Sequence, residues 1–231
     1  MSQLRTSLEI SERAANKRPW LILCWAVAAG FLLAATLRAQ HYPPIREILA
    51  QPVTDYQGRS DFGPLLNMAS DRYHFPLGLE LGPDALGNTK SFRLPHGTVE
   101  DLLDLIVGLM PAYQWAVRGG VINVMPRDNP DSVLEVRIHR LQLHELGGLS
   151  LGQPIASLPE IKAWLEKNGV VQSTVIAGIF HPFEEPLRIS VDAKDATLRE
   201  ILNSIVRTGQ ARVWSVVRYG RKGEFLHISA E

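Results

Sequence analysis

Two pairs of aspartates have the spacing that acid–base chemistry uses. Asp101 and Asp104 are three residues apart, which places both carboxylates on one face of a predicted helix, as a general acid and base would be. Their position in the first two turns explains them without chemistry, because carboxylates stabilise the positive end of a helix. Asp192 and Asp195 flank the turn before a second predicted helix, where aspartate commonly forms turns. We therefore expect neither pair to be catalytic.

The sequence also contains no clear motif for binding a metal ion or a cofactor. The seven histidines are scattered, and the nearest approach to a ligand cluster is His139 and His144 with Glu145. In an extended segment His139 and His144 point to opposite faces unless a bulge intervenes. The chain also has no nucleophile-elbow, serine–lysine or glycine-rich phosphate-binding motif. We expect no catalytic, metal-binding or cofactor-binding residues, and a protein that is not an enzyme.

One concentration of basic and aromatic side chains could bind a partner. Its members are Arg212, Arg218, Tyr219, Arg221 and Lys222. They could dock an anionic protein or lipid headgroups. The alternative is a solvated hairpin tip with Trp214 in the core. It is favoured because the related segment around Trp115 lacks the basic loop.

The segments that would form the elements around these residues occur twice in the sequence. The segment Thr98–Val107, TVEDLLDLIV, returns 99 residues later as Thr197–Val206, TLREILNSIV. The same offset places Trp115 on Trp214 in the strand that follows each segment. Because the offset holds through a helix and a strand, it favours an internal duplication.

The predicted helices share their start and stop signals. Each copy has apolar residues at helical spacing behind a capping-box pattern, in which a threonine is followed three positions later by an acidic residue. The capping pairs are Thr98 with Asp101 and Thr197 with Glu200, and the predicted stops are Gly108 and Gly209. A third capping box is predicted from Ser157 and Glu160, with Pro159 in the first turn of the helix and Gly169 at its end.

Strands surround these helices in the same order in both copies. A leading strand and a helix are followed by the apolar segments FPLGLEL and SFRL in the first copy, and by STVIAGIF and PLRISV in the second. After the repeated helix each copy has a hairpin, which turns at Gly119-Gly120 or at YGRKGE. We predict the α+β class, with two tandem small domains that each have the order β-α-β-β-α-β-β. The units are residues 45–126 and 133–231, joined by a linker at 127–132.

Residues 1–39 carry an export signal. Trp20–Leu37, an uncharged run of 18 residues, follows Arg5, Arg13, Lys17 and Arg18. This bias of basic residues predicts an N-terminus in the cytoplasm and export of the remainder. The run is long for a signal peptide and just long enough to span a bilayer. Cleavage after about Ala39 and retention as a single-pass membrane anchor both stay open.

Composition describes a globular protein with a mildly acidic exported part. Hydrophobic residues make up 45% of the chain and charged residues 21%, which excludes wholesale disorder. Five of the 24 basic and two of the 24 acidic side chains lie in residues 1–39, which leaves 19 basic against 22 acidic. We expect no nucleic-acid binding, because that function needs a concentrated basic face. The single cysteine, Cys24, rules out a disulfide framework.

The segments LRISVDAKDA–TLREILNSIV and SFRLPHG–TVEDLLDLIV share a pattern. An alternating strand and a short polar turn lead to a threonine at a helix start and a stripe of leucine and isoleucine. The pattern resembles the short N-terminal domain shared by secretins and TonB-dependent receptors. QWAVRGGVINVMPRD is similar to segments of bacterial envelope proteins built from such units. The likeness spans most of residues 45–230 when both copies are counted.

This resemblance implies a periplasmic location, beyond the bacterial inner membrane, and contacts with other envelope proteins. In secretins the contacts join subunits and inner-membrane partners, and in receptors they signal to an inner-membrane regulator. No sequence for an outer-membrane barrel or a secretin pore follows Glu231, so pore formation and transport are not expected.

We therefore expect a non-enzymatic envelope protein that binds other proteins through a sheet edge or the hairpin tip of the second unit. The N-terminal helix would contact the inner membrane if it is not cleaved. An alternative is a module that senses a ligand or glycan in a cleft between the units, and an unrecognised enzyme is a third. Convergent polar groups in such a cleft would favour the alternative, whereas an exposed apolar edge would favour protein binding.

The two helix copies differ at positions where we expect solvent exposure. Arg199 stands in place of Glu100, and Asn203 in place of Asp104, while the caps and the apolar stripe are kept. A duplicated catalytic site would keep its polar groups. We predict that the repeated helices are scaffold and that specificity lies in the parts that differ.

Overall fold

The computed structural model describes residues 42–147, 151–173 and 188–231. Within these ranges the chain is a mixed α+β protein with six α-helices and ten strands, which confirms the predicted fold class. The predicted apolar run at 20–37 and most of the predicted strand STVIAGIF lie outside the described residues. None of the helices in the described ranges is both long and apolar enough to cross a membrane.

The elements follow one another in the order that gives each half its architecture. After a short helix α3 (Ile45–Leu49), the first half contains β1 (Pro52–Ser60), α4 (Phe62–Tyr73), β2 (Leu77–Leu81), β3 (Lys90–Thr98), α5 (Val99–Gly108), β4 (Tyr113–Arg118) and β5 (Val121–Pro126). The second half contains β6 (Arg137–Leu146), α6 (Gly152–Ala156), α7 (Pro159–Asn168), β7 (Val171–Gln172), β8 (Ile189–Thr197), α8 (Leu198–Arg207), β9 (Val213–Tyr219) and β10 (Phe225–Ala230). A 3-10 turn, η1 (Pro83–Ala85), lies between β2 and β3, and a second, η2 (Val133–Glu135), lies between β5 and β6.

Both halves contribute strands to one six-stranded sheet. Its order is β4-β5-β2-β9-β10-β7, so three strands come from each half. β2 is parallel to β5 on one side and to β9 on the other, where Leu77–Leu81 pairs with Val213–Val217. The predicted units 45–126 and 133–231 are therefore joined, and Gln40–Glu231 is one compact unit. An isolated first half would leave the backbone groups along one side of β2 unpaired, and β9 satisfies them.

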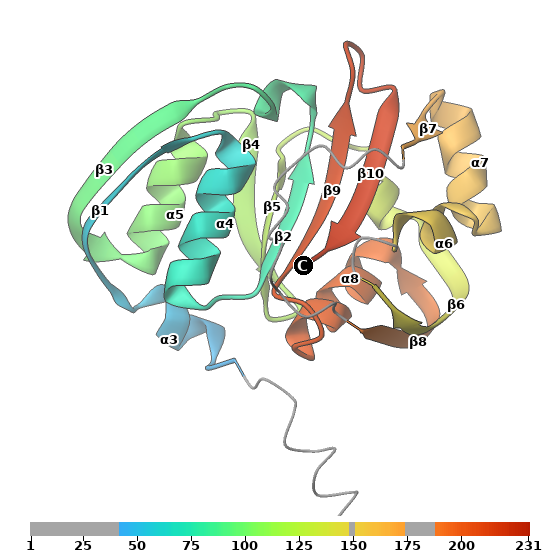
Figure 1. The fold of residues 1–231 in the computed structure, drawn as a ribbon, viewed down its shortest axis with the longest axis horizontal. Helices are drawn as coiled ribbons and strands as arrows, with labels where there is room; N and C mark the ends of the chain where they lie inside the picture. The colour runs from blue at the N-terminus through green and yellow to red at the C-terminus, as the bar shows by residue number, and fades with distance from the viewer. Residues whose placement is uncertain (1–41, 148–150, 174–187) are drawn as a thin grey trace, which may run out of the picture. The chain divides into compact units, whose positions relative to one another are not determined.

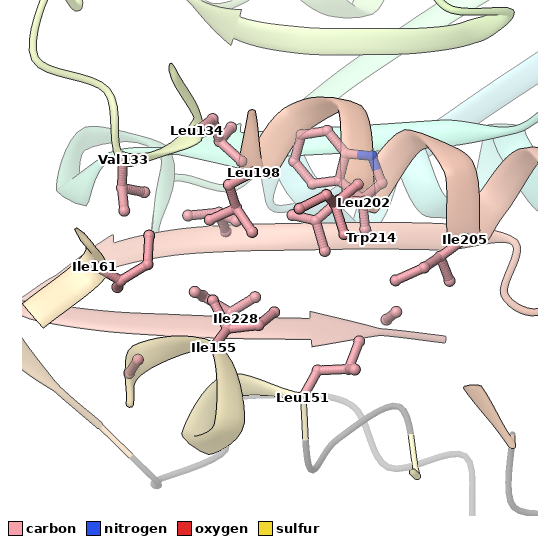
Figure 2. Close-up of a cluster of buried hydrophobic side chains, with 14 of the residues drawn as sticks. Val133, Leu134, Leu151, Ile155, Ile161, Leu198, Leu202, Ile205, Trp214 and Ile228 are labelled. Carbon is pink, nitrogen blue, oxygen red and sulfur yellow. The ribbon is translucent and has the colours of Figure 1, made fainter. Parts of the chain in front are cut away.

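Each face of this sheet has its own hydrophobic core. Helices α4 and α5 cover one face under the curved two-stranded ribbon β1–β3 (Figure 1). Helix α8 lies on the other face, with the ribbon β6–β8 packed against it. Because strand side chains alternate, Leu77 and Leu79 of β2 enter the first core, whereas Trp214 and Val216 of β9 enter the second. Figure 2 shows Trp214 in the second core beside side chains from α8.

Helices α5 and α8 begin as the sequence predicts. The hydroxyls of Thr98 and Thr197 accept the backbone N–H of Asp101 and Glu200. The two carboxylates in turn accept the threonine N–H at 2.7 and 2.8 Å. Such a reciprocal cap stabilises a helix by about 1 kcal/mol.

Both repeated helices end at or beside the predicted glycine, but with different backbone geometry. Gly209 follows α8 with a left-handed φ of 71°, where a residue without a side chain avoids steric strain. Gly108 is instead the last residue of α5, and Leu109 caps that helix in a right-handed conformation.

The third predicted capping box, Ser157 with Glu160, is wrong. Helix α6 ends just before Ser157, whose hydroxyl donates to a carbonyl of that helix. Glu160 accepts the backbone N–H of His139 at 3.1 Å instead. Pro159 does lie in the first turn of α7, and Gly169 ends α7 with a φ of 61°, both as predicted. No pattern in the sequence predicted α6, a five-residue helix that ends at Ser157 and uses its hydroxyl.

The two halves are related by a half-turn combined with a shift along the sheet. β4 is antiparallel to β5, while β5, β2 and β9 are mutually parallel, so β4 and β9 run in opposite directions. Trp115 packs against the first core and Trp214 lies in the second, on opposite faces of the sheet. A half-turn about an axis that runs across the strands reverses both the strand direction and the face of the sheet. This half-turn, followed by a shift of three strands along the sheet, relates the first half to the second.

Candidate functional site

Two positions that we expected to be exposed are buried. Arg199 and Asn203 on α8 are only 5% and 6% exposed, whereas their counterparts Glu100 and Asp104 on α5 are exposed. The expectation fails because α8 presents a second face to β5 and β2 in addition to its apolar stripe. The parts that differ between the two helix copies therefore lie at the junction of the halves.

Arg199 forms an ion pair with Glu80 across this junction. Arg199 Nη2 lies 2.8 Å from Glu80 Oε2, and both side chains are almost fully buried. The other guanidinium nitrogens donate to Glu135 at 2.8 Å and to Asn123 at 3.3 Å. Since Glu80 is in β2 and Arg199 is in α8, the pair holds the second half to the first.

The predicted linker at 127–132 completes the coordination of Glu80. Asn129 Nδ2 donates to Glu80 Oε1 at 2.6 Å, and Ser132 Oγ donates to the same atom at 2.5 Å. The carboxylate thus accepts from one cation and two neutral donors, which offsets the cost of burying its charge. The linker is therefore attached to the sheet by its own polar side chains.

The indole of Trp214 extends this set of contacts along α8. Its Nε1 donates to Asn203 Oδ1 at 2.8 Å, and Asn203 Nδ2 donates to the carbonyl of Arg118 at 3.1 Å. Asn123 Nδ2 also lies 3.3 Å from Asn203 Oδ1. We call the connected side chains the junction network, which consists of Glu80, Asn123, Asn129, Ser132, Glu135, Arg199, Asn203 and Trp214.

The tryptophan contact occurs in both copies. Trp115 Nε1 donates to Asp104 Oδ1 at 2.7 Å, just as Trp214 donates to Asn203 eleven residues earlier in the chain. The hydrogen-bond acceptor is a carboxylate in the exposed copy and a neutral amide in the buried copy. An uncharged acceptor avoids the cost of burying a second anion beside Glu80. The duplicated helices therefore keep a polar contact, contrary to our expectation.

Two hollows border the junction network. The smaller has a volume of about 200 Å³ and lies beside Glu80, with Trp164, Arg218 and Lys222 in its wall. The larger has a volume of about 490 Å³, between α8 and the end of β4, and we call it the arginine groove. Its arginines are Arg118, Arg199 and Arg207. Polar groups thus converge where the halves meet.

Most of the charged groups in the arginine groove already have partners. Glu135 bonds Arg199 and lies 3.5 Å from Arg118 Nη1. The backbone N–H and the hydroxyl of Thr197 lower the pKa of Glu200, which they bind as part of the helix cap. Arg207 makes no hydrogen bond or ion pair with any residue that the structure describes. The groove is largely self-neutralised.

The five basic and aromatic residues singled out in the sequence do not form one cluster. Arg218, Tyr219, Arg221 and Lys222 belong to the β9–β10 hairpin, but Arg212 precedes β9 and pairs with Asp71 at 2.5 Å. Seven residues of β9 separate it from the tip, a span of roughly 23 Å.

The hairpin tip itself is ordered by its own contacts. Arg218 lies over the Trp164 ring at 5.9 Å and donates to the carbonyl of Gly223 at 3.1 Å. Tyr219 stacks on Phe225. Arg221 and Lys222 are exposed, and Trp214 is fully buried as predicted.

The remaining candidate residues for chemistry have structural surroundings. Asp101 caps α5 and Asp104 binds Trp115. Gln142 donates to Asp192, and His139 lies 3.4 Å from Asp195, with both side chains of the latter pair exposed. Within the described ranges, no three His, Cys, Asp or Glu side chains gather as metal ligands would.

β6 contains a bulge near the end of the segment that holds His139 and His144. The register shifts between Leu143 and Leu146, and Glu145 adopts a φ of 49°. Glu145 forms an exposed ion pair with Arg188 at 3.0 Å. The bulge therefore serves a turn and a surface contact.

Within the part of the chain that the structure describes, β4 presents an unpaired edge of the six-stranded sheet and pairs with β5 only. The two strands are joined by the Gly119-Gly120 turn, where both glycines have positive φ as a two-residue hairpin turn requires. Arg118 and Val121 flank this turn and form a hydrogen-bonded pair, and the pattern alternates along the strand. The backbone groups of Trp115 and Val117 therefore point away from β5.

No protein-family model, curated protein or solved structure matches the chain. The function is therefore argued from the geometry of the junction network, the hollows and the β4 edge.

Proposed function

We propose that residues 42–231 are a non-enzymatic protein-binding module of the bacterial cell envelope, and that the edge of β4 is its docking surface. The single observation that carries the proposal is this open edge. A strand whose outward N–H and C=O groups are unpaired accepts a partner strand, and alternate side chains then select the partner.

The side chains along β4 suit such a role. Val117 is 39% exposed, Trp115 is half-buried, and charge appears only at the end of the strand, at Arg118. Natural edges are usually protected by lysine, proline or a bulge, and β4 contains none of these between Tyr113 and Arg118. An edge left unprotected in a stable protein is expected to have a partner.

The order of elements supports the same class of function. The first half reads β-α-β-β-α-β-β, and the second half differs from this order in having two helices, α6 and α7, after its first strand. We propose that the halves are tandem units resembling the secretin and TonB-receptor N-terminal domain. We propose that the apolar run at 20–37 exports this part of the chain to the periplasm. The run would be cleaved after about Ala39 or kept as an N-in anchor in the inner membrane.

The arginine groove is the observation that favours the alternative, a module that senses a ligand or glycan. Its volume of about 490 Å³ is within the range of small-molecule sites, and it lies between the halves. Binding there would have to use Arg207 or disrupt the contacts of Glu135. We prefer the edge, because its backbone groups need no such disruption.

Photo-crosslinking in intact cells tests the proposal. A photoreactive side chain in place of Val117 is expected to give adducts with another polypeptide chain, because a docked strand would lie against it. The same group at Met68, which is 48% exposed on α4, is the matched control and should give none. A third arm at Lys222 probes the hairpin tip.

Adducts from Lys222 alone would move the docking surface to the tip. Equal yields from Val117 and Met68, or none from either, would contradict protein binding through β4. If the protein instead binds a small ligand in the arginine groove, we expect no adducts from either position.

A further inference from the structure

β9 of the second half is the counterpart of β4, and a strand is already docked on it. β2 pairs with β9 in parallel register, and the backbone N–H of Leu77 donates to the carbonyl of the residue before β9 at 3.2 Å. Because alternate residues of a strand face the same neighbour, the backbone groups of Trp214 and Val216 also face β2. On the 99-residue offset these two residues correspond to Trp115 and Val117, whose backbone groups point outward on β4. The pairing of β2 with β9 is therefore a template for a strand docked on β4.

The charge that β2 carries on this edge is matched by α8. Glu80 is the register partner of Val216, and its carboxylate pairs with Arg199 of α8 at 2.8 Å. The residue of α5 that corresponds to Arg199 is Glu100, so the sign of the charge is reversed beside β4. A strand docked on β4 in the same register would present its residue opposite Val117 to Glu100. Lysine or arginine at that position would restore an ion pair.

α5 holds Glu100 in the place that Arg199 has on α8. The same cap and the same tryptophan contact fix each helix relative to its strand. Glu100 is exposed and has no hydrogen-bond or ion-pair partner among the described residues. Asp104 is exposed on the same helix face, four residues further along, and adds a second negative charge. This side of β4 is thus suited to a basic partner.

The template also favours a small residue opposite Trp115. Gly78 is the register partner of Trp214, and a Cβ on it would lie 2.3 Å from two carbons of the indole ring. Trp115 is held by the equivalent indole contact, to Asp104 at 2.7 Å. Its ring should therefore lie across the matching position of a docked strand, where glycine leaves the most room.

We propose that the occupant of the β4 edge is an extended segment of another protein, with glycine opposite Trp115 and, two residues later, lysine or arginine opposite Val117. The segment runs parallel to β4, as β2 runs parallel to β9. Its main chain bonds the outward backbone groups of β4, and its basic side chain selects this edge through Glu100. An acidic residue at the same position would be repelled. This inference rests on the proposed role of β4 as a docking edge.

Binding of short labelled peptides to the full-length protein tests this selection. The probes are FPLGLEL, which is the sequence of Phe75–Leu81, and its Glu80→Lys variant. Fluorescence anisotropy should show that the Glu80→Lys peptide binds about five-fold more tightly or better, because attraction to Glu100 replaces repulsion. Adding Gly78→Ala to that peptide should weaken its binding by about five-fold or more, because the new Cβ would meet the ring of Trp115.

Exchange of the charge on α5 should reverse the preference. Glu100→Arg gives α5 the residue type that α8 has at this position, so FPLGLEL should then bind more tightly than the Glu80→Lys peptide. Glu166→Arg on α7 makes the same charge change beyond the opposite end of the sheet and should leave the preference unaltered (Figure 1). Both glutamates are exposed, so the two variants and the unaltered protein should share one thermal transition.

The inference is wrong if the two peptides bind the unaltered protein equally or not at all, or if Glu100→Arg leaves their order unchanged. Photo-adducts of Val117 that contain only a second copy of this chain would also overturn it. Adducts of Val117 with another protein, without any preference between the peptides, would remove the basic strand and leave the proposed function standing. The absence of both adducts and peptide binding would remove both.

Discussion

Replacement of Arg199 by methionine is expected to lower the free energy of unfolding by about 3–5 kcal/mol. The methionine would fill similar space, but Glu80 Oε2 would lose its cation while remaining buried. Asn129 and Ser132 would still donate to Oε1, which is insufficient for a full negative charge away from water. A loss of this size is a large fraction of the stability of a typical domain.

Urea unfolding of the full-length chain, followed by tryptophan fluorescence, measures this loss. Glu100→Met changes the equivalent position of α5, which is exposed, and should alter stability by less than about 0.5 kcal/mol. Adding Glu80→Leu to Arg199→Met should recover part of the loss, because no unpaired charge would then remain buried. Equal effects of Arg199→Met and Glu100→Met would show that the ion pair does not hold the halves together.

Gly78→Ala is expected to cost about 1–3 kcal/mol or more, for a steric reason. A Cβ at this position of β2 would lie 2.3 Å from two ring carbons of Trp214. The ring cannot turn away freely, because Trp214 is fully buried and its Nε1 is bonded to Asn203. β2 or the indole would have to shift, and either shift disturbs the pairing of β2 with β9.

The control is a glycine with open space around it. Gly108→Ala at the end of α5 meets no atom within 4 Å, so we expect no loss and a gain of up to about 1 kcal/mol from helix propensity. Both variants are compared by thermal unfolding of the full-length chain. A neutral Gly78→Ala would mean that β2 and Trp214 are not packed as closely as described.

Local signals in the sequence predicted the individual elements well. The capping pairs of α5 and α8 depend on residues three apart, and the Gly119-Gly120 turn depends on two adjacent residues. The burial of Trp214 follows from its place in an alternating apolar strand. Such features require no knowledge of distant partners, so composition and spacing are sufficient.

The junction network could not be predicted in this way, because its partners lie far apart in the chain. Glu80 and Arg199 are separated by 119 residues. Helical periodicity marks one apolar stripe on α8 but does not reveal that a second, polar face is also covered. One signal was present: Glu80 is the only charged residue in the otherwise apolar segment FPLGLEL, and a buried carboxylate requires a partner.

The sharing of one sheet by both halves was missed for a related reason. Two copies of a pattern predict two similar folds, but they do not specify which edges will pair. That choice depends on Gly78 and Glu80 facing Trp214 and Arg199 across the junction. The first half has no arginine at the equivalent position, and no other described strand pairs with the outer edge of its β4.

Amide hydrogen exchange along β4 tests most directly the claim that this edge is open in the monomer and covered by a partner. In dilute full-length protein, Trp115 and Val117 should exchange rapidly, while Ala116, Trp214 and Val216 should be protected. With a partner strand docked on β4, the amides of Trp115 and Val117 should exchange as slowly as those of Trp214 and Val216. Strong protection of Trp115 and Val117 in the dilute monomer would contradict the account, because the edge would then be covered by the chain itself.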